Sequence, residues 1–390
     1  MRALRVVFLL LFFGFSLLPL SATWLHFAPP QNLSGVTDEI PKLPPFNWKN
    51  YFSGQFQQAF ERNFDADLAF RGQFVRADNE LNLRVFHQLG MNPRESMIIG
   101  KDDFIFVRPY VEAYNRHDEV SSAELEPKVR RLALLQEYMK SRGNLVLLLI
   151  SPSKPHLYPE YLPQGVIVKD RLSVPSNYER LLPLLQRYGI NTVDAEAYLE
   201  TRKGQVPFPF FASTALHWND PAACEASALI MNTIGERLGE PMPTLQCEPY
   251  TFRDVPKAAD IDILKVCNLW FEERLYRPTP YARGRVVGRG GALPSVLVIG
   301  GSFNWAVLDY LKKARFSDHT FLRYFSTKFV RGGKRPFDRS AFDFEQDAFS
   351  KRVIIIEANV NVVQHLGWGF LEDAERAIKS APPPAAPSAP

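Results

Sequence analysis

The chain has 390 residues, of which 46% are hydrophobic and 23% are charged. This is the composition of a globular protein with enough length for a large core, and it argues against a disordered or fibrous chain. The net charge is +4, and no extended run of lysine or arginine of the kind that binds nucleic-acid phosphates occurs. We therefore expect no nucleic-acid partner.

The N-terminus has the pattern of an export signal. Two arginines lie within the first five residues, and residues 6–20 are apolar apart from Ser16. The basic end stays in the cytoplasm, so we expect the rest of the chain in the periplasm. We favour an inner-membrane signal anchor over residues 1–23, because Leu20 stands where a cleavage site prefers a small residue. A cleaved signal peptide stays open, because the apolar run is shorter than the roughly 20 residues of a standard span.

Residues 24–94 are expected to form a linker and an N-terminal helical segment. Residues 28–46 are rich in proline and polar side chains, which is typical of a linker. An apolar stripe on a helix is indicated by four phenylalanines that recur every four residues, namely Phe52, Phe56, Phe60 and Phe64. We expect this aromatic stripe to be part of the core.

Residues 95–380 alternate between apolar strands and helices. The expected strands are two short ones within 98–107, then 145–150, 190–193, 295–299 and 352–356. The expected helices are 127–142, 178–188, 221–238, 305–314 and 371–380. This alternation predicts a three-layer α/β/α, flavodoxin-like domain whose mainly parallel sheet is covered on both faces. The tail at 381–390 is almost entirely proline and alanine, and we expect it to be disordered.

Three cysteines, Cys224, Cys247 and Cys267, limit the redox chemistry. The count is odd, so at least one thiol stays free unless it pairs between chains. None lies in a C-x-x-C pair, which argues against a zinc site or thioredoxin-type chemistry. One disulfide between two of the three is open in an oxidising compartment.

A glycine turn carries the candidate nucleophile. The strand at 295–299 runs into Gly300, Gly301 and Ser302 and then into a helix. In a parallel α/β sheet, sites form beyond the carboxyl ends of the strands. The glycines let the chain turn tightly, and the helix start supplies N–H groups that can stabilise an oxyanion. The alternative is that Ser302 only caps the helix, because serine is a favoured cap.

His217 is the candidate general base. It lies between a loop rich in proline and phenylalanine and the helix at 221–238. A histidine side chain can take the proton of a serine near neutral pH. The alternative is a structural histidine.

The segment 151–159 leaves a strand at the expected edge of the site. It can line a substrate groove, or it can be a rigid proline loop. The candidates for the groove and the oxyanion site are Lys154, Tyr158, Trp218, Gly301 and Phe303.

Together these segments resemble the SGNH-hydrolase-like acetyltransferase domain of the alginate O-acetyltransferase family. Residues 99–106 are similar to its Gly-Lys-Asp-Gly-Trp-Leu-Phe motif, and residues 151–158 are similar to its Pro-x-Lys…Tyr-Pro loop. Residues 217–219 are similar to its Asp-x-His-Trp segment, and residues 300–303 to its nucleophile turn. Order and spacing agree over roughly residues 48–377.

The resemblance implies an enzyme that transfers acetyl groups to hydroxyls of an exported polysaccharide. Ser302 would be the nucleophile that forms an acetyl-serine, and His217 the base. No metal or organic cofactor is implied. A membrane-bound O-acyltransferase is implied as the partner that supplies acetyl groups. The resemblance leads us to expect the membrane-anchored type of the family, because the family's alginate-binding type has an additional carbohydrate-binding module that we do not recognise in this sequence.

One residue departs from the family pattern. The family's aspartate, two residues before the histidine, is replaced by Ala215. A triad acid orients the imidazole and stabilises its charged form. Ser302 and His217 could act as a dyad, or another carboxylate could substitute; the candidates are Asp194, Asp220 and Glu357. A carbohydrate acetyl-esterase and a non-catalytic polysaccharide-binding or assembly protein are the alternatives to a transferase.

Overall fold

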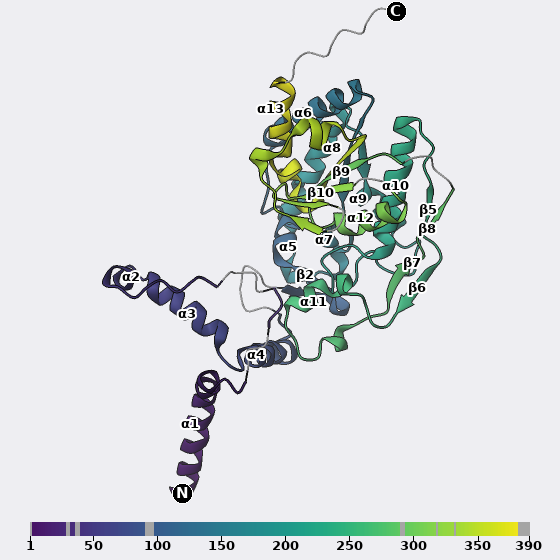
Figure 1. The fold of residues 1–390 in the computed structure, drawn as a ribbon. Helices are drawn as coiled ribbons and strands as arrows, with labels where there is room; N and C mark the ends of the chain where they lie inside the picture. The colour runs from purple at the N-terminus through teal and green to yellow at the C-terminus, as the bar shows by residue number, and fades with distance from the viewer. Residues whose placement is uncertain are drawn as a thin grey trace, which may run out of the picture. The chain divides into compact units, whose positions relative to one another are not determined.

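The computed structural model describes residues 2–28, 32–35, 40–89, 97–288, 293–316, 319–330 and 333–380. The chain divides into two compact units (Figure 1). The smaller comprises Met1–Met97 with Asp262–Leu275, and the larger comprises Ile98–Ile261 with Tyr276–Pro390. The segment Asp262–Leu275 thus joins the N-terminal unit although it is distant in sequence. The tail at 381–390, expected to be disordered, lies outside the described residues.

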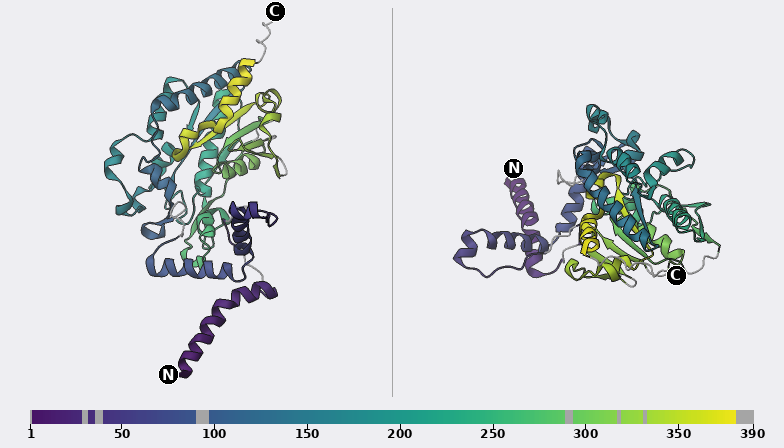
Figure 2. Two further views of the ribbon diagram at one scale, coloured as in Figure 1. Left: turned by 90° about the vertical axis from the view of Figure 1, so that its left-hand side faces the viewer. Right: turned by 90° about the horizontal axis from the view of Figure 1, so that it is seen from above.

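A seven-stranded sheet forms the centre of the larger unit (Figure 2). The strand order is β12-β11-β10-β9-β13-β3-β4. The strands are β3 (Leu145–Ser151), β4 (Thr192–Asp194), β9 (Val296–Gly300), β10 (His319–Arg323), β11 (Thr327–Val330), β12 (Gly333–Arg335) and β13 (Val353–Asn359). All pairs are parallel except those of β11, which is antiparallel to β10 and β12. Every residue of β3, β9 and β13 is buried, as in strands covered on both faces.

The last strand of the chain lies in the middle of this sheet. β13 pairs with β3 on one side and with β9 on the other, so that Ile355 lies opposite both Leu147 and Val298. The flavodoxin order of parallel strands is 2-1-3-4-5, whereas counting the parallel strands here along the chain gives 2-1-5-3-4. The end of β13 is thereby placed beside the ends of β3 and β9. The expected α/β fold with a mainly parallel sheet is confirmed.

Helices cover both faces of the sheet, which confirms the three-layer architecture. One face carries α9 (Ala195–Arg202), α10 (Asp220–Leu238) and α12 (Asn304–Lys313), and the other carries α6 (Ser122–Ser141), α8 (Asn177–Arg187) and α13 (Phe370–Ser380). Strand side chains alternate between the two faces. Leu147 and Val298 pack with the first group of helices, and Val146 and Ile299 pack with the second.

Side-chain caps set where these helices begin. In α6, Ser121 and Glu124 form a capping box, so the helix begins at Ser122 and not at residue 127, where the sequence reading placed it. A second capping box begins α8. Asn219 caps α10 by accepting the N–H of Ala222. The cap of α10 lies two residues after His217 and fixes the end of the loop that carries it.

Shorter elements surround this core. They are β1 (Met97–Ile99), β2 (Ile105–Val107), α5 (Arg108–Tyr114), α7 (Lys154–Leu157), β5 (Thr244–Gln246), β6 (Tyr250–Arg253), β7 (Thr279–Ala282) and β8 (Arg285–Val287). β1 pairs with β2, β5 with β8, and β6 with β7. The two short strands expected within residues 98–107 are thus present.

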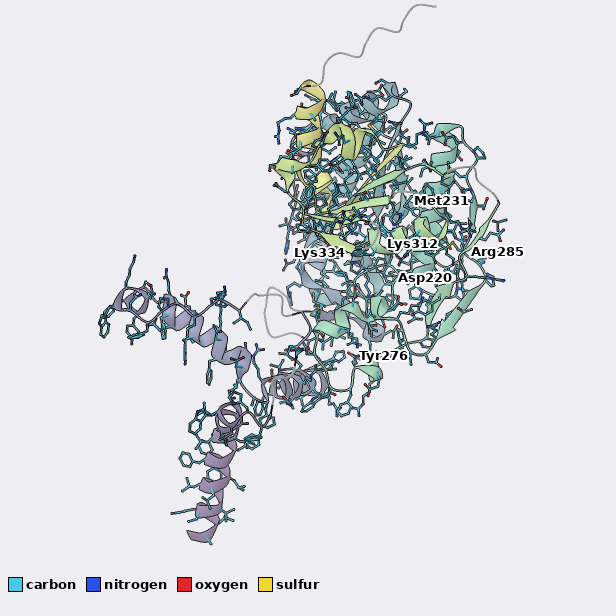
Figure 3. The ribbon with its side chains drawn as sticks, viewed as in Figure 1. Asp220, Met231, Tyr276, Arg285, Lys312 and Lys334 are labelled. Atoms are coloured by element: carbon cyan, nitrogen blue, oxygen red, sulfur yellow. A yellow bond between two sulfur atoms is a disulfide. The ribbon has the colours of Figure 1, made fainter. Side chains whose placement is uncertain are left out.

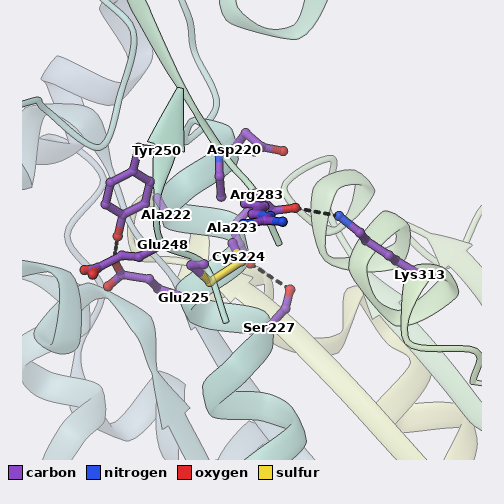
Figure 4. Close-up of a disulfide and its surroundings, with 12 residues drawn as sticks. Asp220, Ala222, Ala223, Cys224, Glu225, Ser227, Glu248, Tyr250, Arg283 and Lys313 are labelled. Atoms are coloured by element: carbon purple, nitrogen blue, oxygen red, sulfur yellow. Dashed lines mark hydrogen bonds between the residues drawn. A yellow bond between two sulfur atoms is a disulfide. The ribbon is translucent and has the colours of Figure 1, made fainter. Parts of the chain in front are cut away.

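A disulfide joins Cys224 of α10 to Cys247, which follows β5 (Figure 4). Beside it, the hydroxyl of Tyr250 donates a hydrogen bond to Glu225. Cys267 is buried and free, and burial raises the pKa of its thiol to about 12. The pairing that the sequence left open is therefore Cys224 with Cys247, and a disulfide is typical of exported proteins.

The smaller unit contains five α-helices among the described residues: α1 (Arg2–Leu25), α2 (Trp48–Phe52), α3 (Gln55–Asp67), α4 (Arg71–Phe86) and α11 (Asp262–Val266). Residues 3–25 of α1 form a continuous apolar helix with a mean hydropathy of 2.3 over its most apolar window. That helix is long enough to cross a membrane, although a signal sequence meets the same test.

The aromatic stripe is not part of the core, which corrects the sequence-based expectation. Phe52 is 80% exposed, Phe60 is 50% exposed, and Ala59 is the only buried residue of α3. Figure 3 draws the side chains of the described residues as sticks on the ribbon. The periodicity predicted the helix correctly. The apolar face of a helix does not show what covers it, and no described element of the smaller unit covers this one.

Candidate active site

Three strand ends meet at one edge of the sheet. β9 ends at Gly300, β13 ends at Asn359, and β3 ends at Ser151. Ile356 pairs with Ile299, and Asn359 pairs with Ser151, so the carboxyl ends of the three strands lie in register. This is where parallel α/β sheets place their sites.

The turn after β9 exposes Ser302. A Cβ atom at Gly300 would lie 2.6 Å from both Glu357 Oε2 and Asn304 Nδ2, so no larger residue fits there. The chain then enters α12, whose capping position is Phe303 and which has no side-chain cap. The hydroxyl of Ser302 is therefore not used to cap the helix.

His217 lies against this hydroxyl. Its Nε2 is 2.7 Å from Ser302 Oγ, and both residues are partly exposed. The imidazole packs against Phe303, with ring centroids 4.8 Å apart. Trp218 Nε1 donates a hydrogen bond to the carbonyl of Phe303 at 3.1 Å. The loop that carries the imidazole is thus attached to the turn that carries the serine.

A buried lysine holds that loop in shape. Lys154 is 2% exposed, and its Nζ donates to the carbonyls of Ala212, Ser213 and Ala215 at 2.7–2.9 Å. It also donates to the carbonyl of Ile105 on β2 at 2.8 Å. A buried ammonium needs such partners, because its desolvation is costly. Lys154 therefore does not line an open groove, which corrects the sequence-based expectation.

Three further residues expected in the groove are buried. Tyr158, Trp218 and Phe303 are each less than 5% exposed. The hydroxyl of Tyr158 accepts the N–H of Phe210 and so supports the loop before His217. These aromatic side chains form the packed floor of the site and present no surface to a substrate. Aromatic side chains close to a site can form the wall of a groove, but their size favours the interior.

Glu357 anchors the nucleophile turn. Its carboxylate accepts hydrogen bonds from Gly301 N at 2.6 Å, from Asn304 Nδ2 at 3.1 Å and from the hydroxyl of Ser151. Burial raises the pKa of Glu357, against the lowering effect of Ser151, Gly301 and His217. Because the N–H of Gly301 points at Glu357, it is not the oxyanion donor that the sequence reading proposed.

The other two candidate carboxylates are occupied elsewhere. Asp194 accepts the hydroxyl of Tyr178 at 2.7 Å and caps α9. Asp220 accepts the N–H of Ala282 at 2.7 Å, beside the disulfide (Figure 4). Within the described residues, no hydrogen bond joins either aspartate to His217. Both are thus corrected as candidates to orient the imidazole.

Tyr324 was missed by the sequence reading. Its hydroxyl donates to Ser302 Oγ at 3.5 Å, and its backbone N–H donates to the carbonyl of Gly300 at 2.8 Å. Its φ of +50° is a strained conformation for a tyrosine, of the kind that clusters at functional sites. Trp368, whose ring lies 4.7 Å from that of Tyr324, also has a positive φ. A loop tyrosine without a motif gives no signal in a single sequence.

The arrangement can perform nucleophilic acyl chemistry. It combines a partly exposed hydroxyl, an imidazole within hydrogen-bond reach and a helix start beside them. Within the described ranges, no group of three or more His, Cys, Asp or Glu side chains is arranged to hold a metal ion.

Comparison with protein families matches residues 97–283 to the SGNH hydrolase-like domain of the acetyltransferase AlgX. The matched segment contains Lys154 and His217 and ends before Ser302. The resemblance recognised from the motifs is thereby confirmed.

Two similar proteins are named probable alginate O-acetylase AlgJ. The one from Pseudomonas syringae pv. tomato is 24% identical over 343 residues, which cover 81% of this chain and 78% of the relative. The one from Pseudomonas aeruginosa is 25% identical over 189 residues, which cover 48% of this chain and 42% of the relative.

Two similar solved structures are those of an AlgJ protein and an AlgX protein. The O-acetyltransferase domain of Pseudomonas putida AlgJ is 15% identical, with a TM-score of 0.45, and the match covers 69% of this chain and 92% of that one. Pseudomonas aeruginosa AlgX is 14% identical, with a TM-score of 0.44, and the match covers 72% of this chain and 68% of that one.

Proposed function

We propose that this chain is a periplasmic O-acetyltransferase that acetylates hydroxyls of an exported polysaccharide through an acetyl-serine at Ser302. The observation that carries the proposal is the distance of 2.7 Å between His217 Nε2 and Ser302 Oγ, in a turn at the carboxyl ends of parallel strands. The relatives named alginate O-acetylases support the choice of acetyl transfer and of a polysaccharide acceptor.

In the first step, Ser302 Oγ attacks the carbonyl carbon of the acetyl donor while its proton passes to His217 Nε2. The tetrahedral intermediate then collapses. The bond between the acetyl carbon and the donor's leaving oxygen or sulfur breaks, and the leaving group takes the proton from His217. The products are an acetyl ester on Ser302 and a neutral imidazole.

In the second step, a sugar hydroxyl attacks the acetyl ester and gives its proton to His217 Nε2. Collapse breaks the bond between the acetyl carbon and Ser302 Oγ, which recovers the proton. In this scheme the backbone N–H of Ser302, just before α12, stabilises the oxyanion in both steps, because free N–H groups at a helix start favour negative charge.

Glu357 and Lys154 act as positioning residues in this scheme. Glu357 holds the N–H of Gly301 and places a buried carboxyl near the imidazole that becomes positively charged. Lys154 holds the carbonyls of the loop that carries His217. The position of the family's aspartate is taken by Ala215, whose carbonyl is one of those that bind Lys154.

The cellular setting follows from the N-terminus and the acetyl donor. We propose that α1 anchors the chain in the inner membrane and that the remainder lies in the periplasm, where a disulfide such as Cys224–Cys247 is stable. Acetyl donors are made in the cytoplasm, so a membrane-bound O-acyltransferase would pass acetyl groups to Ser302.

The test measures where the acetyl group goes. The full chain in detergent is incubated with a chromogenic acetyl ester, with or without alginate or a neutral glucan. We expect acetyl on the polysaccharide and faster ester consumption as the acceptor concentration rises, with both lost in Ser302→Ala. Release of acetate only, independent of acceptor, would identify an acetyl-esterase. A folded protein that consumes no ester would identify a polysaccharide-binding protein.

A further inference from the structure

The N-terminal unit exposes a continuous set of aromatic rings on α2, on α3 and on the residues just before them. We call this set the aromatic surface; it comprises Phe46, Trp48, Tyr51, Phe52, Phe56, Phe60 and Phe64. Phe56, Phe60 and Phe64 stack in a row, with centroids 6.2 Å apart at each step. Phe46 joins this row to the rings of α2, with its centroid 5.2 Å from that of Phe56 and 6.2 Å from that of Trp48.

Most of these rings are not packed into the N-terminal unit. Trp48 is 68% exposed, Phe46 is 61% exposed, and α2 buries none of its residues. Soluble proteins rarely leave a contiguous apolar patch of this kind open to water, so such a patch marks an interaction site. We propose that the aromatic surface lies on the outer face of the lipid bilayer that α1 crosses.

The aromatic surface is continuous with the outer end of α1. Phe64 lines an apolar pocket together with Leu17, Leu20 and Trp24 of α1. The backbone N–H of Ala69, just after α3, donates to Thr23 Oγ1 at 2.8 Å. A bilayer that surrounds α1 has its interface near the end of that helix, so one end of the aromatic surface lies at this level.

The residue types fit a lipid interface. Trp, Tyr and Phe are the side chains that collect at the boundary between headgroups and acyl chains. Residues 46–67 contain two basic residues, Lys49 and Arg62, against three acidic ones, Glu61, Asp65 and Asp67. A negative balance cannot attract anionic lipid, so we expect ring insertion to drive the contact and added salt not to weaken it.

The polar residues of α3 lie on another face. Gln58 is exposed and lies about 160° around the helix from Phe60, because two residues at about 100° each turn the helix by roughly 200°. A helix that lies flat on a membrane therefore places the side chain at position 60 among lipid and the side chain at position 58 in water.

The experiment compares these two positions. Single variants Phe60→Cys and Gln58→Cys of the full chain are spin-labelled and reconstituted in phosphatidylethanolamine–phosphatidylcholine nanodiscs, and the unsubstituted chain corrects for labelling of Cys267. Collisions of each label with oxygen and with a water-soluble nickel chelate are measured. We expect the label at 60 to meet oxygen and not nickel, and the label at 58 to meet nickel, at low and high salt.

Two outcomes would overturn the proposal. If the label at 60 meets the nickel chelate as freely as the label at 58, the aromatic surface lies in water. If it meets neither reagent, a protein covers it, either a second copy of the chain or a partner.

Quenching by brominated lipid gives a second readout on a chain without new cysteines. We expect part of the tryptophan quenching to disappear in Trp48→Phe, and an unchanged signal would also contradict the proposal. Acetyl transfer plays no part in either readout.

Discussion

Glu357 Oε2 accepts the backbone N–H of Gly301 at 2.6 Å, one residue before Ser302. This bond ties the last strand of the sheet to the turn that carries the nucleophile. Sequence order separates the two residues widely, and only the central place of β13 brings them together. The relationship makes Glu357 a positioning residue whose charge can be tested apart from its shape.

The variant Glu357→Gln keeps the shape of the side chain and its acceptor for Gly301. We expect kcat to fall roughly 10-fold, equivalent to about 1.4 kcal/mol, because the imidazolium loses a nearby negative charge. KM should change little. The free energy of unfolding should not fall, because burial of this carboxylate is unfavourable. Steady-state kinetics and urea unfolding check both expectations, with the exposed Glu112→Gln as control. Equal losses of stability and activity would instead indicate a purely structural role.

The variant Lys154→Met removes the donor for four buried carbonyls. We expect the free energy of unfolding to fall by about 2–5 kcal/mol, because buried acceptors without a partner are costly. The rate of acetylation of Ser302 should also fall, because the loop before His217 loses its support. Urea unfolding and ester hydrolysis are compared with Lys140→Met on the exposed face of α6. Identical unfolding midpoints for the two variants would refute the role given to Lys154.

The variant Tyr324→Phe removes one hydroxyl near the nucleophile. That hydroxyl donates to Ser302 Oγ at 3.5 Å, a long bond in the resting site. We expect kcat to fall roughly 3- to 10-fold, in the range of a lost neutral hydrogen bond, with little change in stability. Ester turnover is measured beside Tyr138→Phe, a change on α6 away from the strand ends. Unchanged turnover would show that Tyr324 only packs against Trp368.

A buried glutamate away from Ser302 predicts how stability depends on pH. Burial raises the pKa of Glu196 to about 8, from an ordinary value of 4.5. Its carboxyl accepts the N–H of Ser153, and burial lowers the pKa of the neighbouring His156 to about 4. Between pH 4.5 and about 8 the folded state keeps a proton on Glu196 that the unfolded state releases. Stability from this group is thus present at low pH and lost as the pH rises through that window.

The variant Glu196→Gln removes that loss. We expect it to be more stable than the wild type at pH 8.5 by roughly 2–4 kcal/mol, with a much smaller difference at pH 5. Urea midpoints across this range provide the measurement. Parallel stability curves for the two proteins would show that Glu196 titrates normally.

The elements that periodicity marks were predictable from sequence, and those that depend on distant contacts were not. The apolar runs of β3, β9 and β13 indicated a buried parallel sheet. The strand end before the glycine turn pointed to Ser302, and a histidine in a loop before a helix pointed to His217. Lys154 looked like a groove residue, because nothing in a sequence shows that four carbonyls surround an ammonium. Asp194 ends a strand as expected, yet a nearby tyrosine and a helix start use its oxygens.

In the N-terminal unit, the sequence predicted the helix but not its surroundings. The spacing of Phe56, Phe60 and Phe64 correctly predicted a helix with one apolar face. Periodicity gives the face but not what covers it, so the inference of a core position was wrong. The joining of Asp262–Leu275 to this unit likewise depends on long-range packing, for which local sequence carries no pattern.

The most direct test of the central claim is the intact mass of the full chain after brief exposure to a reactive acetyl ester. We predict one added acetyl group on wild type and on Ser326→Ala, mapped by peptide analysis to Ser302. His217→Ala should form the adduct roughly 100-fold or more slowly, because the base that takes the proton is absent. Ser302→Ala should form no adduct. An acetyl group that appears on Ser302→Ala as fast as on wild type would contradict the account.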